Sequence, residues 1–334
     1  MRRRSLTLLT AGALALGLAA CGSADTPSGS DGTTGAASGE NGGDGETPHI
    51  AIISKGFQHQ FWQAVKNGAE AEAERQGATI TFEGPATERE VEAQITMLTN
   101  ALAKDPAAIG FAALDTKAAE QALQQADGKD IPIIAFDSGV DSDLPLTTCA
   151  TDSKAAAAEA AKHMSELLGG EGKVGVIVHD QTSMTGRDRQ DGFLEWMEEN
   201  APNIEVLTPV VGDGDQAKSA DLLKAMVAAN SDLAGVYGTN EGSAIGIVKG
   251  LEELNQTGLQ VIGFDSGQAQ IDAIESGLMA GAITQNPVGI GECVVDAAMK
   301  AINGETLDEL VDTGFYWYDQ SNIDDETIQA VLYQ

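Results

Sequence analysis

An internal repeat constrains the fold of this chain more than any other feature. The run "IPIIAFDSG" at residues 131–139 and the run "LQVIGFDSG" at residues 259–267 end in the same four letters. Four further pairs of positions keep an offset of 126 residues: Ile52 and Val178, Ile80 and Val206, Met97 and Leu223, Phe111 and Tyr237. A steady offset over several elements predicts two similar halves.

Each half alternates short apolar runs with segments of helical spacing. In the segment 61–77, apolar side chains form one stripe and Gly77 marks the end. The expected strands are continuous apolar runs at 49–54, 78–84, 107–115 and 131–139, and again at 173–180, 204–212, 233–241 and 259–267. Strand–helix repetition of this kind predicts an α/β fold with two similar, doubly wound, parallel-sheet lobes.

The two FDSG segments stand where such sheets bind ligands. Ligands of open parallel sheets lie beyond the carboxyl ends of the strands. Both segments follow a predicted strand directly. If the carboxyl edges of the two lobes face each other, Asp137 enters the cleft from one wall and Asp265 from the other. The alternative interpretation is that both aspartates are turn residues, since Asp-Ser-Gly suits a turn.

The N-terminus has the features of a lipoprotein signal. Arg2 to Arg4 are followed by the short apolar run Leu6–Leu18, which is too short for a comfortable membrane span. The run ends "LAAC", which resembles a bacterial lipobox and predicts a signal peptide at 1–20 and lipidation of Cys21. The alternative is an ordinary secretory signal with a chance cysteine.

A polar segment separates this signal from the predicted lobes. Residues 22–47 contain no Lys, Arg, Leu, Ile, Val or aromatic residue, so they cannot bury a core. We expect residues 21–47 to form the lipidated cysteine and a flexible tether.

Charge and cysteine content exclude some kinds of partner and site. The chain has 19 Lys+Arg against 51 Asp+Glu, a net charge of −32, which repels nucleic acid. The four histidines show no metal-ligand spacing, so we expect no metal. Cys149 and Cys293 lack a CxxC spacing, and an oxidising compartment permits either a disulfide or two buried free thiols.

Several motifs together resemble one known family. They are "HQFWQAVKNGAEAEAERQG" at 59–77, "IPIIAFDSG" at 131–139, "TGRDRQDGF" at 185–193, "GTNEGSAIG" at 238–246, "VIGFDSG" at 261–267 and "GAITQNPVGIG" at 281–291. With these motifs, the chain from about residue 48 to residue 334 resembles the ribose/galactose-type periplasmic sugar-binding proteins of bacterial ABC importers. These are type I solute-binding proteins.

The resemblance implies a division into lobes and a ligand-binding set. Three crossing strands would join an N-terminal lobe of residues 48–150 plus 286–312 to a C-terminal lobe of residues 151–285 plus 313–334. The matched positions that would bind the ligand are His59, Phe61, Trp62, Asp137, Arg187, Asn240, Asp265 and Gln285.

The chain departs from the ribose-type pattern at three of these family positions. Ser138 stands where those proteins have an arginine, and His59 stands where they have an asparagine. The lobe-two aromatic residue that would stack on the sugar falls at about Gly214. Ser138 therefore becomes a further candidate ligand-binding residue, and only the class of ligand carries over from the family.

The candidate residues suit a small neutral polyol. Carboxylates accept hydrogen bonds from hydroxyls, arginine donates in a fixed fork, and Asn and Gln do both. Aromatic faces cover the apolar C–H patches of a sugar ring. Some members also have simpler interpretations: Asn240 would only cap a helix, and Arg187 would only join a surface charge cluster with Asp188 and Arg189.

The leading hypothesis is a monomeric, lipid-anchored, extracytoplasmic receptor that binds a monosaccharide or polyol and delivers it to a membrane permease. It would need no cofactor and would perform no catalysis. A sugar or autoinducer-like sensor that presents its ligand to a membrane receptor is the alternative, because the same fold serves both. An anchored hydrolase that uses an Asp–Ser pair is disfavoured, since the chain has no G-x-S-x-G elbow.

Overall fold

The computed structural model describes residues 47–333. The predicted signal peptide at 1–20, Cys21 and the tether up to residue 46 lie outside the described residues. Within the described part, the chain forms two sheets, each covered by helices on both faces.

The first sheet has the strand order β12-β5-β4-β3-β1-β2. Its strands are β1 (His49–Ile53), β2 (Thr79–Glu83), β3 (Ala108–Phe111), β4 (Ile133–Phe136), β5 (Thr147–Ala150) and β12 (Leu310–Asp312). All of its described pairs are parallel.

The second sheet has the order β13-β11-β10-β9-β6-β7 and so repeats the first, strand by strand. Its strands are β6 (Gly172–Val178), β7 (Ile204–Val206), β8 (Val210–Val211), β9 (Leu233–Gly238), β10 (Gln260–Phe264), β11 (Gly281–Gln285) and β13 (Phe315–Tyr318). Among the described pairs only β11 and β13 run antiparallel. The predicted α/β fold with two similar parallel-sheet lobes is confirmed.

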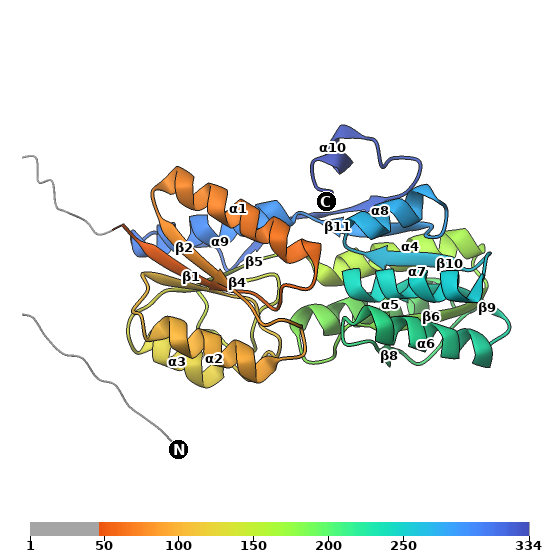
Figure 1. The fold of residues 1–334 in the computed structure, drawn as a ribbon, viewed down its shortest axis with the longest axis horizontal. Coiled ribbons are helices and arrows are strands. Elements are labelled where there is room, and N and C mark those ends of the chain that lie inside the picture. Colours follow the sequence, from red (N-terminus) through yellow and green to blue (C-terminus); the bar gives the residue numbers. More distant parts are fainter. Residues whose placement is uncertain (1–46, 334) are drawn as a thin grey trace, which may run out of the picture. The chain divides into compact units, whose positions relative to one another are not determined.

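Helices cover both faces of the first sheet (Figure 1). They are α1 (Gln60–Gln76), α2 (Val91–Leu102), α3 (Glu120–Asp127) and α9 (Pro287–Ile302). In Figure 1, α1 and α9 lie above the strands and α2 and α3 below them. Strand side chains alternate between the two layers: Ile50 and Ile52 pack with α1 and α9, whereas Ala51 and Ile53 pack with α2 and α3. This double burial explains the continuous apolar strands.

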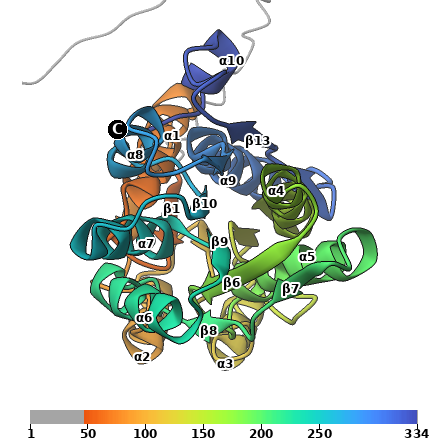
Figure 2. The same ribbon diagram turned by 90° about the vertical axis from the view of Figure 1, so that its right-hand side faces the viewer.

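The second sheet is covered in the same way (Figure 2). The helices of this part are α4 (Ser153–Leu168), α5 (Met184–Asn200), α6 (Gln216–Ala229), α7 (Glu241–Leu254), α8 (Gln268–Glu275) and α10 (Glu326–Gln329). Figure 2 shows α4 and α5 on one side of the strands and α6 and α7 on the other. Within residues 47–333, none of the helices has the length and apolar composition that crossing a membrane requires.

Within the described residues, the chain passes between the two sheets three times. It does so from β5 to α4, from β11 to α9, and from β12 to β13. A disulfide joins Cys149 in β5 to Cys293 in α9, with their Cα atoms 6.0 Å apart. The question that the sequence left open is answered by this bond, which fastens the returning helix α9 to the first sheet.

Two segments differ from the sequence-based expectation. The run 204–212 is divided into β7 and β8, because Pro209 has no N–H to donate to a neighbouring strand. The C-terminal segment was expected in the second lobe, and within the described residues its end contacts both lobes: Leu332 packs against the core of the second lobe, and the hydroxyl of Tyr333 accepts from the N–H of Ser266 at 3.0 Å. The Tyr333 ring packs in the core of the first lobe, 6.2 Å from the ring of Phe61.

Candidate functional site

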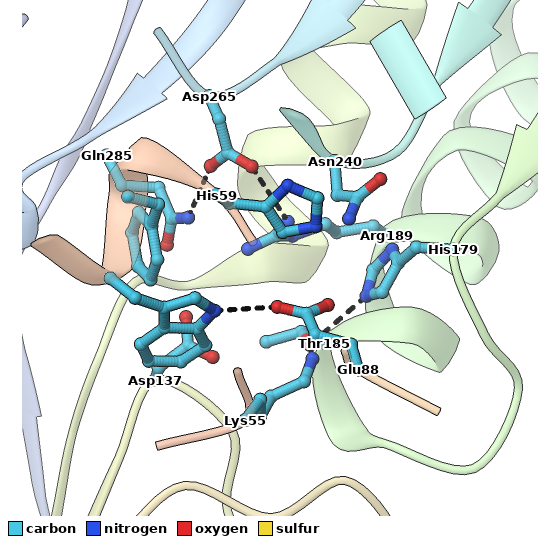
Figure 3. A pocket seen from close by; sticks show the side chains of 12 residues that line it. Lys55, His59, Glu88, Asp137, His179, Thr185, Arg189, Asn240, Asp265 and Gln285 are labelled. Atoms are coloured by element: carbon cyan, nitrogen blue, oxygen red, sulfur yellow. Dashed lines mark hydrogen bonds and ion pairs between the residues drawn. The ribbon is translucent and has the colours of Figure 1, made fainter. Parts of the chain in front are cut away.

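The two FDSG segments have the same backbone conformation. Asp137 follows β4 with a φ of 54°, and Asp265 follows β10 with a φ of 79°. Each backbone N–H donates to the next strand, to the carbonyl of Cys149 at 2.9 Å and to that of Ile283 at 2.6 Å. These left-handed turns at the strand ends aim both carboxyl groups at one pocket, as Figure 3 shows.

The pocket lies between the carboxyl ends of the two sheets. Its empty space is about 270 Å³, including its mouth to solvent. Its lining comes from the first lobe (Lys55, His59, Phe61, Trp62, Glu88, Asp137), from the second lobe (His179, Thr185, Arg189, Asn240, Asp265) and from the second crossing (Gln285). Seven of the nine predicted ligand-binding residues line it together, and Arg187 and Ser138 do not.

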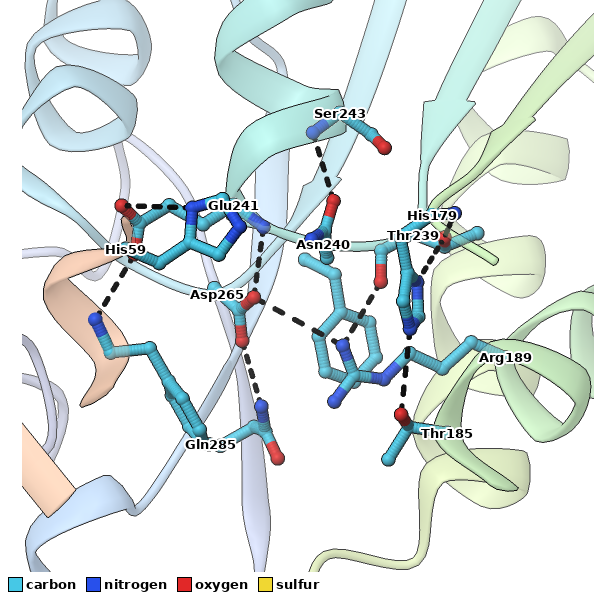
Figure 4. A network of polar contacts seen from close by, with 12 residues as sticks. His59, His179, Thr185, Arg189, Thr239, Asn240, Glu241, Ser243, Asp265 and Gln285 are labelled. Atoms are coloured by element: carbon cyan, nitrogen blue, oxygen red, sulfur yellow. Dashed lines mark hydrogen bonds and ion pairs between the residues drawn. The ribbon is translucent and has the colours of Figure 1, made fainter. Parts of the chain in front are cut away.

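Asp265 is held by a network of donors from its own lobe (Figure 4). Its Oδ1 accepts from Nε2 of Gln285 at 2.7 Å, and its Oδ2 accepts from the backbone N–H of Glu241 at 2.8 Å. The guanidinium of Arg189 lies 4.0 Å from the same Oδ2. These contacts fix the orientation of the carboxylate before any ligand arrives.

Asp137 has a different environment although its backbone is the same. Among residues 47–333, no group donates a hydrogen bond to its carboxylate, and the residue is only 6% exposed. Burial raises the pKa of Asp137 to about 6, and the positive charges of Lys55 and Arg189 limit that rise. Its oxygens therefore remain available as acceptors inside the pocket.

The arginine that lines the pocket is Arg189, and the predicted Arg187 does not line it. The guanidinium of Arg189 stacks 3.7 Å from the ring centre of Phe264 and donates to the carbonyl of Thr239 at 3.0 Å. Two residues on a helix point about 200° apart, so Arg187 faces away from the pocket. It pairs with Asp141 at 3.3 Å, and its side chain is 38% exposed.

Lys55 crosses the cleft from the end of β1. Its Nζ donates to Oγ1 of Thr185 at 3.1 Å and lies 3.9 Å from Oδ2 of Asp180. Lys55 is 2% exposed, so it is a buried cation held by groups of the opposite lobe.

Glu88 lies in the loop between β2 and α2, against Trp62. Its Oε1 accepts from the indole Nε1 at 2.7 Å. Burial by itself would raise the pKa of Glu88, but the charges of Lys55 and His59 outweigh it and lower that pKa. Glu88 is therefore an ionised acceptor whose second oxygen has no hydrogen-bond donor among the described residues.

His179 follows β6 and lies beside Thr185 and Thr239. Its Nδ1 is 2.7 Å from Oγ1 of Thr239, and its Nε2 is 3.4 Å from Oγ1 of Thr185. Burial lowers the pKa of His179 to about 3, against the opposite effect of Asp180. A neutral imidazole at this place can take part in hydrogen bonding without adding charge.

Sequence reasoning missed Lys55, Glu88, His179, Thr185 and Arg189. For two of them, Lys55 and His179, the sequence held a usable signal. Lys55 comes two residues after β1 and His179 comes directly after β6, so both stand at carboxyl ends of predicted strands. Glu88 lies in a loop and carries no such signal.

Asn240 both caps a helix and lines the pocket. Its Oδ1 accepts from the N–H of Ser243 at 2.9 Å, which caps α7 and leaves the amide Nδ2 on the pocket side. Gly214 lies next to this amide with a φ of +62°, and a Cβ built on it would lie 3.1 Å from Nδ2. Glycine thus lets the loop after β8 approach the site closely.

The aromatic residues of the pocket come from the start of α1. Phe61 and Trp62 pack edge to face, with ring centres 4.9 Å apart, and both also belong to the core of the first lobe. Of the described pocket-lining residues, none from the second lobe is Phe, Tyr or Trp. Any stacking on a ligand ring by such a residue therefore comes from the first lobe.

The FDSG serines have no nucleophilic arrangement. Oγ of Ser138 is buried with no hydrogen-bond partner among the described residues, and Oγ of Ser266 lies 2.8 Å from Oγ1 of Thr284. Neither serine lines the pocket, and neither hydroxyl forms a hydrogen bond to a histidine or a carboxylate among the described residues. The pocket instead combines acceptors, donors and apolar ring faces around a small volume, which suits the binding of a compact polar molecule.

Known proteins resemble this chain in sequence and fold. A family model described as "Periplasmic binding protein domain" matches residues 50–306. The ribose import binding protein of Haemophilus influenzae is 27% identical over 267 residues, which cover 78% of this chain and 87% of that protein.

Solved structures agree. An ABC transporter solute-binding protein from Agrobacterium vitis, bound with alpha-D-tagatopyranose, is 32% identical with a TM-score of 0.83, covering 86% of this chain and all of that one. Another from the same organism, with bound D-fucose, is also 32% identical with a TM-score of 0.83, covering 85% of this chain and all of that one. The family model matches most of the described residues, and the structure has two repeated lobes with a pocket between them. We conclude that this chain belongs to the periplasmic binding protein domain family.

Proposed function

We propose that this protein is the extracytoplasmic substrate-binding component of a carbohydrate ABC importer. It binds a monosaccharide or small polyol between its lobes and delivers it to a membrane permease. The observation that carries this proposal is the pair of strand-end carboxylates, Asp137 and Asp265, which enter one pocket from opposite lobes. The ribose-, tagatose- and fucose-binding proteins described above support the class of ligand.

The polar lining supports a neutral sugar. Asp137 and Glu88 offer acceptor oxygens, Arg189 and Asn240 offer donors, and Trp62 offers an apolar face. Each hydrogen bond to a charged group contributes roughly 1.5–3 kcal/mol, so a few of them suffice for micromolar binding after the cost of ordering. No step of this function requires a bond to be made or broken.

A thermal-shift panel of pentoses, hexoses and polyols tests the proposal, and D-ribose, D-tagatose and D-fucose are its first members. We expect one small polyol to raise the melting temperature by several degrees. Arg189→Met should abolish the shift. The matched variant Arg187→Met, which alters a half-exposed arginine two residues away, should retain it. The proposal fails if nothing on the panel binds, or if both variants respond alike.

We also propose that the mature protein is a monomer tethered to the outer face of the cell membrane through lipid on Cys21, with residues 22–47 as the tether. Two or more acyl chains on one cysteine give stable anchoring. Cys21→Ser should therefore release the protein from the membrane fraction into the soluble extracytoplasmic fraction. An unchanged distribution between these fractions would contradict the lipid anchor and leave the sugar-binding proposal intact.

A further inference from the structure

Two helices begin at the cleft without a cap from their own lobe. The N-cap residue of α1 is His59, whose side chain makes no capping bond, and the N-cap residue of α8 is Gly267, which has no side chain. The first backbone N–H groups of a helix have no partner within the helix, so they need acceptors from elsewhere.

Both helices receive their acceptors from the opposite lobe. The Glu241 carboxylate, in the second lobe, accepts from the N–H of Gln60 at 3.0 Å and from the N–H of Phe61 at 3.1 Å. In return, Oε1 of Gln60, in the first lobe, accepts from the N–H of Gln268 at 2.9 Å. Figure 4 shows Glu241 reaching to the segment around His59 where α1 begins.

Glu241 also connects this contact to the binding site. Its own N–H donates to Oδ2 of Asp265, so one residue supports a pocket carboxylate and caps the helix that carries Phe61 and Trp62. Glu241 is 3% exposed, and a buried carboxylate needs such compensation. The positive end of α1 and its two N–H donors supply it. Neither Glu241 nor Gln60 lines the pocket.

We propose that Glu241 and Gln60 hold the lobes closed by exchanging helix caps, so that they set ligand affinity without touching the ligand. This inference rests on the proposed function, in which the lobes close around a sugar. When the lobes separate, the three N–H groups pass to water and the caps are lost. The caps therefore stabilise only the closed form, which makes Glu241 and Gln60 positioning residues.

The proposal predicts a specific kinetic signature. If a substitution destabilises the closed state of the protein, which holds the ligand, the ligand binds more weakly by the same factor. Removing an N-cap typically costs enough free energy to change an equilibrium about tenfold. Glu241→Ala should therefore raise the Kd about tenfold, mainly through faster dissociation, because the first encounter with the open form is unchanged.

The test measures the distance between the lobes directly. Spin labels on Thr96→Cys in α2 and Asp221→Cys in α6, both exposed positions, report lobe separation by pulsed electron resonance. The ligand-free protein is compared with the protein in D-tagatose, D-fucose or D-ribose. In Glu241→Ala and Gln60→Ala we expect populations shifted toward larger separation. Glu241→Gln keeps an acceptor oxygen and should fall between Glu241→Ala and the unmodified protein.

A matched control separates this role from ordinary helix stabilisation. Asp152 caps α4 within one lobe, accepting from the N–H of Ala155 at 2.9 Å. Asp152→Ala should lower the melting temperature of the ligand-free protein and leave lobe separation unchanged. Glu241→Ala should leave the melting temperature of the ligand-free protein unchanged and shift the lobes toward larger separation.

The proposal is overturned if Glu241→Ala leaves the distance distribution unchanged, or if it lowers the ligand-free melting temperature as Asp152→Ala does. If none of the three sugars binds the unmodified protein, that result counts against the sugar class alone. The proposal on the helix caps is then tested by comparing the ligand-free distance distributions of Glu241→Ala and the unmodified protein.

Discussion

The two FDSG segments are the same piece of backbone in two different electrostatic environments. Asp137 and Asp265 share a left-handed turn at a strand end and the same hydrogen bond to the neighbouring strand. Yet Asp265 has donors from Gln285 and Glu241 on its carboxylate, whereas the Asp137 carboxylate has none among the described residues.

This difference indicates a division of labour between the lobes. Asp265 holds Gln285 and Arg189 in place and keeps only part of its acceptor capacity for a ligand. Asp137 leaves all of its acceptor capacity to the ligand, at the cost of a buried charge without donors. The duplicated backbone thus places one carboxylate on each wall of the pocket, and the neighbouring side chains determine how many hydrogen bonds each carboxylate can accept from a ligand.

The largest expected effect is on binding, and we expect it at both aspartates, with the greater loss at Asp137. Asp137→Asn replaces a charged acceptor whose whole capacity serves the ligand, and two lost charged hydrogen bonds weaken binding roughly a hundredfold or more. Asp265→Asn should weaken binding less, because that carboxylate already accepts from Gln285 and Glu241. Titration calorimetry with the sugar that responds in the thermal-shift panel measures this change. A loss at only one aspartate would refute the idea that both walls hold the ligand.

The second effect should have opposite signs in the two lobes. The pKa of Asp137 is raised to about 6, so its charge costs stability above that pH, by up to about 3 kcal/mol relative to the neutral group. Asp137→Asn should therefore raise the ligand-free unfolding free energy at neutral pH. Asp265→Asn should lower it, because an NH2 group then replaces one of the two oxygens that accept from Gln285 and Glu241.

Urea unfolding of the two variants near neutral pH measures these changes. Destabilisation by both substitutions would mean that Asp137 already has donors in solution. The comparison between the lobes would then have to be abandoned, whatever the effect on binding.

The third effect is on pH dependence. Ligand hydroxyls that donate to Asp137 favour its charged form, so affinity should fall as pH decreases through about 6, by up to about tenfold per unit. His179 stays neutral over this window, because its pKa is lowered to about 3. Calorimetry in buffers of different ionisation enthalpy should detect a proton released on binding below pH 6 and none well above it. Affinity that is constant between about pH 5 and pH 8 would contradict a ligand role for the Asp137 carboxylate.

The smallest effect concerns the serines. Ser266→Ala removes the hydrogen bond to Oγ1 of Thr284 and should cost about 1 kcal/mol of unfolding free energy. Ser138→Ala removes a buried hydroxyl that has no partner among the described residues and should be neutral or slightly stabilising. Urea unfolding of the pair measures the difference, and equal costs would indicate that Ser138 has a partner in solution.

Periodicity and the repeat predicted most of the architecture. The alternation of apolar runs and helical segments specified the strands, and the steady offset specified two lobes with matching strand order. Both signals arise from local chemistry, since buried strands must be apolar and strand ends must turn. The division of the run 204–212 was missed, although Pro209 was visible in it.

The site was predicted where strand ends or specific motifs define it and missed where packing decides. Asp137, Asp265 and Asn240 follow strands directly, so their positions follow from the fold. Choosing between Arg187 and Arg189 requires knowing which face of α5 packs on the sheet, and the charged motif around them does not contain that information. Glu88 depends on the path of a loop, which apolar periodicity does not describe.

The disulfide has a consequence for limited proteolysis of the molecule. The bond between Cys149 and Cys293 spans 144 residues, and these contain every described strand from β6 to β11. The bond thus closes most of the second lobe, apart from β13 and the C-terminal segment, into a covalent ring whose two cysteine Cα atoms lie 6.0 Å apart in the first lobe. A single protease cut within this ring releases no fragment until the bond is reduced.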